Sequence, residues 1–216
     1  MAIKLKICGV TRPGDLAACV ELGVDAVGIN LWSGSRRGLT LAQARQLLRD
    51  VPQHHQPDHG IELVGVFVNP AADEVQRAYE TLGLDLVQVI RDAPGAPESL
   101  PYMLVIRGTP ALDELVIPMP APARYLLDAA VPGYGGAGQT TDWSWARAAA
   151  QKLSATAPVW LAGGITPDNA AAARRAVEPA GLDVASGAEL PDARRGEKDR
   201  ARIAALLAAC RASMSL

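Results

Sequence analysis

Two side chains capable of acid–base chemistry follow short apolar runs in this sequence. Cys8 ends the run Lys6-Ile7-Cys8, and Asp128 ends Tyr125-Leu126-Leu127-Asp128. An ionised thiol can remove a proton, and a carboxyl group that burial keeps protonated can donate one. The alternatives are a buried cysteine that packs as a small hydrophobic residue and an aspartate that caps the next loop. The residue types therefore allow proton transfer without establishing it.

The spacing around Cys8 predicts its neighbours. Lys4, Lys6 and Cys8 alternate along one predicted strand, so Lys6 should point inward one layer below the thiol. Asp183 on the last predicted strand is a natural partner for Lys6. We expect this nearby cation to bring the pKa of Cys8 toward neutrality, and burial to raise the pKa of Asp128.

Small-residue loops near the end of the sequence are typical of phosphate sites. Ala162-Gly163-Gly164-Ile165 and Ala185-Ser186-Gly187-Ala188 each follow a predicted strand. Glycines let backbone N–H groups approach an anion, so we expect Gly163, Gly164, Ser186 and Gly187 to bind phosphate. Gly136 and Gly138, in the glycine-dense segment 133–139, are further phosphate candidates, although that segment is equally consistent with simple flexibility.

Arginines and histidines supply the remaining candidates. Arg36 and Arg37 follow the second predicted strand, either as a surface charge pair or as a fork that holds a substrate carboxylate. The three histidines, His54, His55 and His59, fall where a helix leads into a strand. That position belongs to the opposite end of the predicted fold, so we expect a solvated loop there and neither a metal nor a cofactor in the site.

Alternating apolar runs and amphipathic segments predict the elements that position these residues. Strands are predicted near 4–8, 26–31, 63–69, 86–90, 103–107, 124–128, 159–163 and 182–186. Helices are predicted near 13–23, 40–50, 70–82, 142–152, 167–177 and 198–211. The segments 91–101 and 108–118, where a fourth and a fifth helix would fall, are short and rich in proline, so we expect irregular structure there.

Eight strands that alternate with helices indicate an α/β protein, a (β/α)8 TIM barrel forming a single domain over residues 1–216. The alternative is an open doubly wound sheet. In the barrel, active sites lie at the C-terminal ends of the strands, which is where Cys8, Asp128 and the glycine loops fall.

Bulk properties narrow the partners and the compartment. The net charge of −2 gives no electrostatic reason to expect nucleic acid or an anionic membrane. No apolar stretch is long enough to span a bilayer, and the N-terminus leads into a strand without a signal-peptide pattern, so we expect a cytoplasmic protein. Three widely spaced cysteines argue against a disulfide framework.

Taken together, the motifs resemble the phosphoribosylanthranilate isomerase family of tryptophan biosynthesis over nearly the whole chain. The matching stretches are 6–11, 23–28, 35–37, 64–69, 126–128, 134–138, 141–143, 161–169, 183–187 and 196–199. The resemblance implies an aldose–ketose isomerase that converts N-(5-phosphoribosyl)anthranilate into 1-(2-carboxyphenylamino)-1-deoxyribulose 5-phosphate without a cofactor. It implies Asp128 as general acid, Cys8 as general base and Arg37 as the anchor of the substrate carboxylate, in a monomer or homodimer.

The sequence also departs from the family pattern. Gln88-Val89-Ile90-Arg91 replaces a usual Gln-Leu-His-Gly, Ile29-Asn30-Leu31-Trp32 replaces an aromatic run, and Arg107 stands where a lysine is usual. Ala137 replaces a common hydroxyl residue in the glycine loop. These changes leave open a divergent paralogue that acts on another sugar phosphate, a Schiff-base enzyme that uses Lys6, or a phosphosugar-binding barrel without activity.

Overall fold

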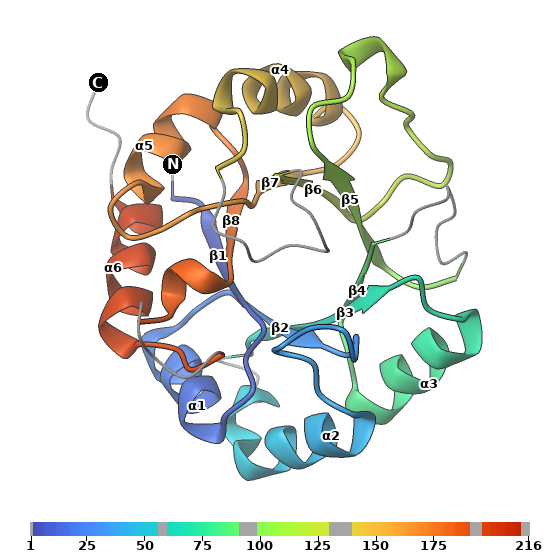
Figure 1. Ribbon diagram of the computed structural model, residues 1–216, viewed down its shortest axis with the longest axis vertical. Helices are drawn as coiled ribbons and strands as arrows, with labels where there is room; N and C mark the ends of the chain where they lie inside the picture. Colours follow the sequence, from blue (N-terminus) through green and yellow to red (C-terminus); the bar gives the residue numbers. More distant parts are fainter. Residues whose placement is uncertain (1, 56–59, 91–98, 130–139, 191–195, 213–216) are drawn as a thin grey trace.

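A closed barrel of eight parallel strands forms the centre of the molecule (Figure 1). The computed structural model describes residues 2–55, 60–90, 99–129, 140–190 and 196–212. The strands are β1 (Lys4–Cys8), β2 (Ala26–Asn30), β3 (Glu62–Val68), β4 (Leu86–Ile90), β5 (Tyr102–Arg107), β6 (Arg124–Asp128), β7 (Val159–Leu161) and β8 (Gly181–Val184). Because β1 pairs with both β2 and β8, the sheet closes on itself. The predicted barrel is confirmed, and the open doubly wound sheet is wrong.

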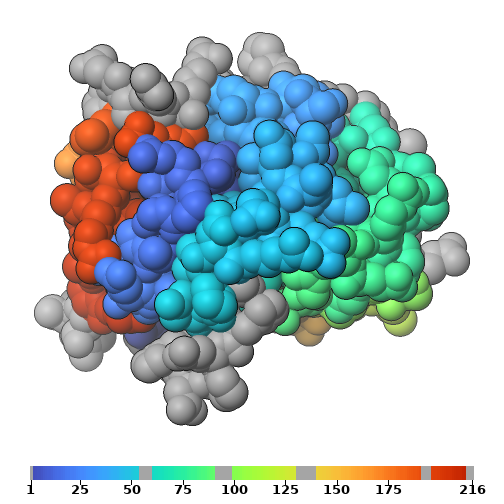
Figure 2. Space-filling model, turned by 90° about the horizontal axis from the view of Figure 1, so that it is seen from below, coloured from blue at the N-terminus to red at the C-terminus, as the bar shows by residue number. Residues whose placement is uncertain are grey.

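Helices form a ring around the strands (Figure 1). They are α1 (Pro13–Leu22), α2 (Leu41–Asp50), α3 (Ala72–Leu82), α4 (Trp143–Leu153), α5 (Ala170–Val177) and α6 (Arg200–Arg211), with 3-10 turns η1 (Pro52–His55), η2 (Leu112–Glu114) and η3 (Ser186–Ala188). Figure 2 shows α6, α1, α2 and α3 side by side on one face. In the described part of the chain, η2 is the one helical turn between β4 and β6, as the proline-rich composition predicts.

Local sequence signals set several helix ends. Pro13 occupies the first position of α1, where its missing N–H costs nothing, and Gly23 ends that helix in the left-handed region with a φ of 72°. Thr40 and Gln43 form a capping box at the start of α2. Asp142 caps α4 by accepting from the N–H groups of Ser144 and Trp145.

Strand alternation divides the core into two apolar clusters. One cluster fills the interior of the barrel and comprises Ala26, Val64, Leu86, Met103, Leu126, Trp160 and Ala162. The larger cluster fills the space between the strands and the surrounding helices. Two positions further along β4 and β6 stand Gln88 and Asp128, so polar side chains follow the apolar interior toward the C-terminal end of the barrel.

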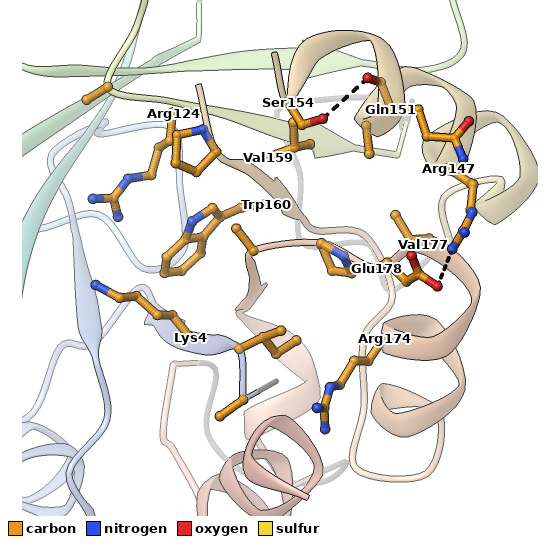
Figure 3. Close-up of a pocket in the computed structure, with 17 residues that line it drawn as sticks. Lys4, Arg124, Arg147, Gln151, Ser154, Val159, Trp160, Arg174, Val177 and Glu178 are labelled. Carbon is orange, nitrogen blue, oxygen red and sulfur yellow. Dashed lines mark hydrogen bonds and ion pairs between the residues drawn. The ribbon is translucent and has the colours of Figure 1, made fainter. Parts of the chain in front are cut away.

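The N-terminal end of the barrel is closed by an ion pair and an aromatic ring. Arg124 donates to both carboxylate oxygens of Glu62, at 2.6 and 2.7 Å, and its guanidinium group lies 5.0 Å from the ring centre of Trp160. Beside them lies a pocket of about 730 Å³, which the starts of β1, β6 and β7 line together with α4 and α5 (Figure 3). Arg147 and Glu178 pair at 2.9 Å at its rim.

Trp160 fits this end of the barrel because residue 181 is glycine. A Cβ atom at Gly181 would lie 2.6 Å from the Trp160 ring, whereas a Cβ atom at Gly14 in α1 would have no neighbour within 4 Å. We expect Gly181→Ala to lower the free energy of unfolding by about 1–3 kcal/mol, because the buried ring has to move. Gly14→Ala, the same chemical change, should raise it by up to about 1 kcal/mol. Urea unfolding measures both, and equal stability of the two variants would contradict this packing.

Candidate active site

The barrel brings the predicted acid, the predicted base and two predicted phosphate loops to one end. Cys8 is the last residue of β1 and Asp128 the last residue of β6, and both side chains are half-buried. The Gly163-Gly164 loop follows β7, and η3, which begins at Ser186, follows β8. Because all the strands are parallel, these positions meet at the C-terminal end of the barrel.

A buried lysine lies directly below this end. Lys6 is fully buried, and its Nζ atom donates to Asp183 Oδ2 at 2.9 Å and to Gln88 Oε1 at 2.6 Å. Burial lowers the pKa of Lys6, but the carboxylate of Asp183 and the thiol of Cys8 outweigh it and leave this pKa above its ordinary value. The predicted Lys6–Asp183 contact is confirmed. The sequence analysis missed Gln88 as a site residue, although a polar residue at an inward position of apolar β4 is a signal for it.

The carboxylate of Asp183 is only partly hydrogen-bonded within the described residues. Its Oδ1 atom is buried and has no hydrogen-bond partner among the described residues. Buried oxygens without partners are uncommon in native proteins and often mark positions where a ligand or water binds. Since Asp183 lies in the layer below Cys8, this oxygen is available to a group bound in the site.

The pKa of the Cys8 thiol differs from the one that the sequence spacing predicts. Burial raises its pKa and the charge of Asp183 adds to this rise, while Lys6, Lys198 and Arg37 lower it by a smaller total amount. The pKa of Cys8 therefore lies above its ordinary value, and the prediction that Lys6 would bring it toward neutrality is wrong. Spacing gives the neighbour of a group correctly, but it does not give the depth at which the group is buried.

Asp128 behaves as the sequence predicts. Burial and the nearby charge of Asp183 raise its pKa to about 6, against smaller opposing effects of the Ala129 N–H group, Arg107 and Lys6. Its Oδ1 atom accepts that N–H bond at 2.9 Å. A substantial fraction of Asp128 therefore carries a proton near pH 6, as a general acid requires.

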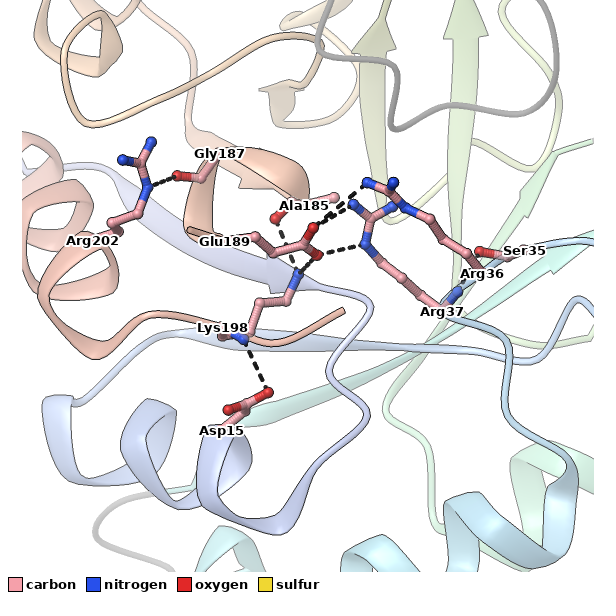
Figure 4. A network of polar contacts seen from close by, with 9 residues as sticks. All are labelled: Asp15, Ser35, Arg36, Arg37, Ala185, Gly187, Glu189, Lys198 and Arg202. Atoms are coloured by element: carbon pink, nitrogen blue, oxygen red, sulfur yellow. Dashed lines mark hydrogen bonds and ion pairs between the residues drawn. The ribbon is translucent and has the colours of Figure 1, made fainter. Parts of the chain in front are cut away.

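Arg37 belongs to a buried ionic network, so for this residue the interpretation as a surface charge is wrong. Its Nε and Nη2 atoms donate to the two oxygens of Glu189 at 2.7 and 2.9 Å (Figure 4). Lys198 Nζ donates to Glu189 Oε1 and to the Ala185 carbonyl, each at 3.0 Å. Burial favours the neutral form of Glu189, but the bonds from Arg37 and Lys198 outweigh it and hold the pKa of Glu189 below its usual value.

The stem of Arg37 lies against the residue that follows Cys8. Gly9 has a φ of 69°, and a Cβ atom there would lie 2.4 Å from Cδ of Arg37. Glycine thus allows both the left-handed backbone turn after β1 and the close passage of Arg37. This contact places the arginine beside the candidate base. Glu189 and Lys198 were not predicted as site residues from the sequence; Arg37 lies 152 positions from Glu189.

The loops after β7 and β8 are packed against each other. A Cβ atom at Gly187 would lie 1.8 Å from the carbonyl oxygen of Ile165, and one at Gly163, which has a φ of 86°, would lie 2.4 Å from Oγ1 of Thr141. Asn169 ties this region to α5 by accepting from Thr166 N at 2.8 Å and donating to Gly164 O at 2.9 Å. Phosphate binding there stays a prediction. Gly136, Gly138 and Ala137 lie outside the described residues.

Metal-binding clusters and membrane-spanning helices are both absent from the described part of the chain. The described residues contain no group of three or more His, Cys, Asp or Glu side chains that could hold a metal ion. They also contain no helix with the length and apolar character that crossing a bilayer requires. His54 and His55 end η1, between α2 and β3, at the end of the barrel opposite the candidate site, and His59 lies outside the described residues.

The fold and the site define a class: a (β/α)8 barrel with a thiol and a carboxyl group at its C-terminal end. The family model described as N-(5′-phosphoribosyl)anthranilate (PRA) isomerase matches residues 5–209. A relative of that name from Thiobacillus denitrificans is 40% identical and covers 99% of this chain and 100% of its own length. The chain therefore belongs to the phosphoribosylanthranilate isomerase family.

Solved structures agree with this assignment. The phosphoribosyl anthranilate isomerase from Thermotoga maritima matches with a TM-score of 0.79 at 28% identity, over 96% of this chain and 98% of that chain. Another structure from that organism shows monomers generated from the dimeric enzyme. An isomerase in complex with reduced 1-(o-carboxyphenylamino)-1-deoxyribulose 5-phosphate matches with a TM-score of 0.76 at 25% identity, with 96% and 98% of the two chains covered.

The raised pKa of Asp128 predicts a measurable cost to stability. The native state holds this proton more tightly than the unfolded chain, so wild-type stability falls as the pH rises from about 4 through about 6. Asp128→Asn avoids this cost and should be more stable at about pH 8, by up to about 3 kcal/mol. Urea unfolding across this pH range measures the effect. Asp168→Asn, at an exposed carboxylate, is the control, and a gain for Asp128→Asn that does not change with pH would contradict the prediction.

The raised pKa of Cys8 predicts slow alkylation near neutral pH. Iodoacetamide reacts with the thiolate, so the rate at Cys8 should rise toward its maximum only above the ordinary thiol pKa of 9.0. Cys19 and Cys210, whose pKa values burial raises to about 12, should react more slowly still. Peptide mass spectrometry assigns the label to each site. A half-maximal rate at Cys8 near pH 7 would instead support the lowered pKa that the sequence predicts.

Proposed function

We propose that this chain catalyses the Amadori rearrangement of N-(5-phosphoribosyl)anthranilate to 1-(2-carboxyphenylamino)-1-deoxyribulose 5-phosphate, a step of tryptophan biosynthesis. One observation carries the proposal. This chain belongs to the isomerase family, and its Cys8 and Asp128 lie at the C-terminal ends of β1 and β6, above the buried Lys6–Asp183 pair. The domain for this activity is the barrel, taken as residues 1–216.

Asp128 acts first in the proposed reaction. Its protonated carboxyl group donates to the ring oxygen of the ribose, the bond between C1′ and that oxygen breaks, and the substrate opens to a Schiff base. The pKa of about 6 suits this role, because a carboxyl group at its ordinary pKa would hold very little proton near neutrality. Burial and the charge of Asp183 supply that pKa.

Cys8 acts second, as general base. Its thiolate takes the proton from C2′ of the Schiff base, the electron pair of that bond moves toward C1′ and the nitrogen is neutralised. The resulting enolamine then tautomerises to the ketone. Because the free protein raises the pKa of Cys8, the thiolate is the minority form near neutrality, and the nearby cations Lys6, Lys198 and Arg37 oppose that rise.

The substrate is held at its two anionic ends. Arg37, which lies against Gly9, binds the anthranilate carboxylate in this proposal. The phosphate is bound by backbone and hydroxyl groups of the three glycine loops, at Gly136, Gly138, Gly163, Gly164, Ser186 and Gly187. The close packing of the loops after β7 and β8 supports this placement, because it holds Gly163 and Gly187 together at the C-terminal end of the barrel.

The proposal extends to assembly and compartment. We propose a cytoplasmic enzyme that acts on a small phosphoribosyl substrate as a monomer or a homodimer. The dimeric state of the Thermotoga maritima relative supports the homodimer as one of these two states. Sedimentation of the purified chain distinguishes the two states.

The test follows the fluorescence of freshly generated phosphoribosylanthranilate after the protein is added. We expect rapid loss of signal with wild type, and a rate lower by about 10²- to 10⁴-fold with Cys8→Ala or Asp128→Asn, since each variant removes one proton-transfer group. Both variants should keep the affinity for the reduced product analogue. Cys210→Ala, which removes a buried thiol on α6, is the matched control.

Two results would overturn the proposal. If folded wild-type protein does not accelerate the loss of fluorescence beyond spontaneous hydrolysis, the chain is a paralogue with another substrate or a binding protein. If either variant turns over like wild type, that residue is not part of the mechanism.

A further inference from the structure

Glu189 accepts hydrogen bonds from the buried side chains of two cations and lies near a third, more exposed cation. Arg37 and Lys198 bond to it directly, and Arg36 Nη2 lies 3.6 Å from its Oε2 atom (Figure 4). With Asp15, which accepts from the backbone N–H of Lys198, the network has three cationic and two acidic side chains, so the cluster remains cationic. A cluster of this kind at the end of the barrel is complementary to a further anion, such as a ligand carboxylate.

The bonds between Arg37 and Glu189 use one edge of the guanidinium group. They run through Nε and Nη2, which form its side edge. No side-chain bond of Arg37 within the described residues uses Nη1, so the end edge, Nη1 and Nη2, can take a second carboxylate in the same plane. The guanidinium group can therefore bridge two carboxylates.

The backbone fixes Glu189 in this position. Glu189 forms an isolated antiparallel bridge with Lys198, and Lys198 N donates to Asp15 Oδ2 at 3.1 Å. Glu189 is 7% exposed and Arg37 5% exposed, so neither side chain has room to turn away. The stem of Arg37 is held from the other side by its contact with Gly9.

We propose that Glu189 is a positioning residue that holds the side edge of Arg37 and so aims the end edge at the carboxylate of the anthranilate ring. The inference deepens the proposed function and rests on it. Glu189 does not touch the substrate, and it acts through Arg37. Lys198 keeps Glu189 ionised and at a fixed position, so that the substrate carboxylate and Glu189 do not compete for the same edge.

The test compares two ligands that differ by one group. The first is reduced 1-(o-carboxyphenylamino)-1-deoxyribulose 5-phosphate, and the second is the same compound without the ring carboxylate. Calorimetry gives the dissociation constant of each for wild type, Glu189→Gln, Glu189→Asp, Arg37→Ala and the double variant. Glu197→Gln is the matched control, because Glu197 is a partly exposed carboxylate in the same region of the chain and pairs with Arg12 and not with Arg37.

Glu189→Gln should weaken binding of the carboxylate ligand by about 10- to 100-fold, the range for a lost charged hydrogen bond. It should change binding of the second ligand by less than about twofold. Glu189→Asp keeps the charge but shortens the side chain, so it should give a smaller loss that is again confined to the first ligand. In the Arg37→Ala background, Glu189→Gln should cause no further loss, because Glu189 acts through Arg37.

Three outcomes would overturn the inference. Equal weakening of both ligands would assign Glu189 a general structural role. If binding of the carboxylate ligand is not weakened, Glu189 does not position Arg37, and tighter binding would show that Glu189 competes for it. Additive losses in the double variant would show that Glu189 acts independently of Arg37. If Glu189→Gln does not fold, Glu189→Asp decides by the same comparison. Failure of the proposed function is distinct: wild type would then show no turnover and no preference for the carboxylate ligand.

Discussion

The buried pair of Lys6 and Asp183 is the interaction on which the site depends. A lysine with no exposed surface requires a compensating charge, and Asp183 at 2.9 Å and Gln88 at 2.6 Å provide it from β8 and β4. Gly28 on β2 leaves room, since a Cβ atom there would lie 2.9 Å from Sγ of Cys8. The pair therefore joins β1, which carries Cys8, to β8, and its charges act on both Cys8 and Asp128.

The charges of Lys6 and Asp183 shift the pKa values of both proton-transfer groups. Asp183 raises the pKa of Asp128, which favours the proton donor, and it also raises that of Cys8, which disfavours the base. Lys6 lowers both pKa values, yet burial prevails at each group. Near neutral pH the acid is therefore mostly ionised and the base mostly protonated. The reactive molecules are a minority in which the proton lies on the carboxyl group, and an anion-binding cluster of Arg37 and Lys198 beside Cys8 favours that distribution.

Period-two and helical patterns were sufficient to predict the barrel, the strand positions and the end at which Cys8, Asp128 and the loops meet. The contact of Lys6 with Asp183 was also predictable, because strand parity and barrel closure place them together. The depth at which each side chain is buried was not predictable. The predicted direction of the pKa shift of Cys8 was therefore wrong, and so was the interpretation of Arg37 as a surface charge. Glu189 was missed because both it and Arg37 lie in loops after strands, where strand alternation does not predict which side chains meet.

Both ends of the barrel contain charged side chains, but these side chains are paired differently at the two ends. At the N-terminal end, Arg124 meets both oxygens of Glu62 and covers Trp160, so every strong partner lies within the protein. At the C-terminal end, Asp183 keeps one buried oxygen without a described partner, and the bonds of Arg37 to Glu189 occupy one edge of the guanidinium group. Incomplete pairing of buried polar groups costs stability, and a bound ligand recovers that cost. Substrate binding is therefore most favourable at the C-terminal end, where these buried polar groups are incompletely paired.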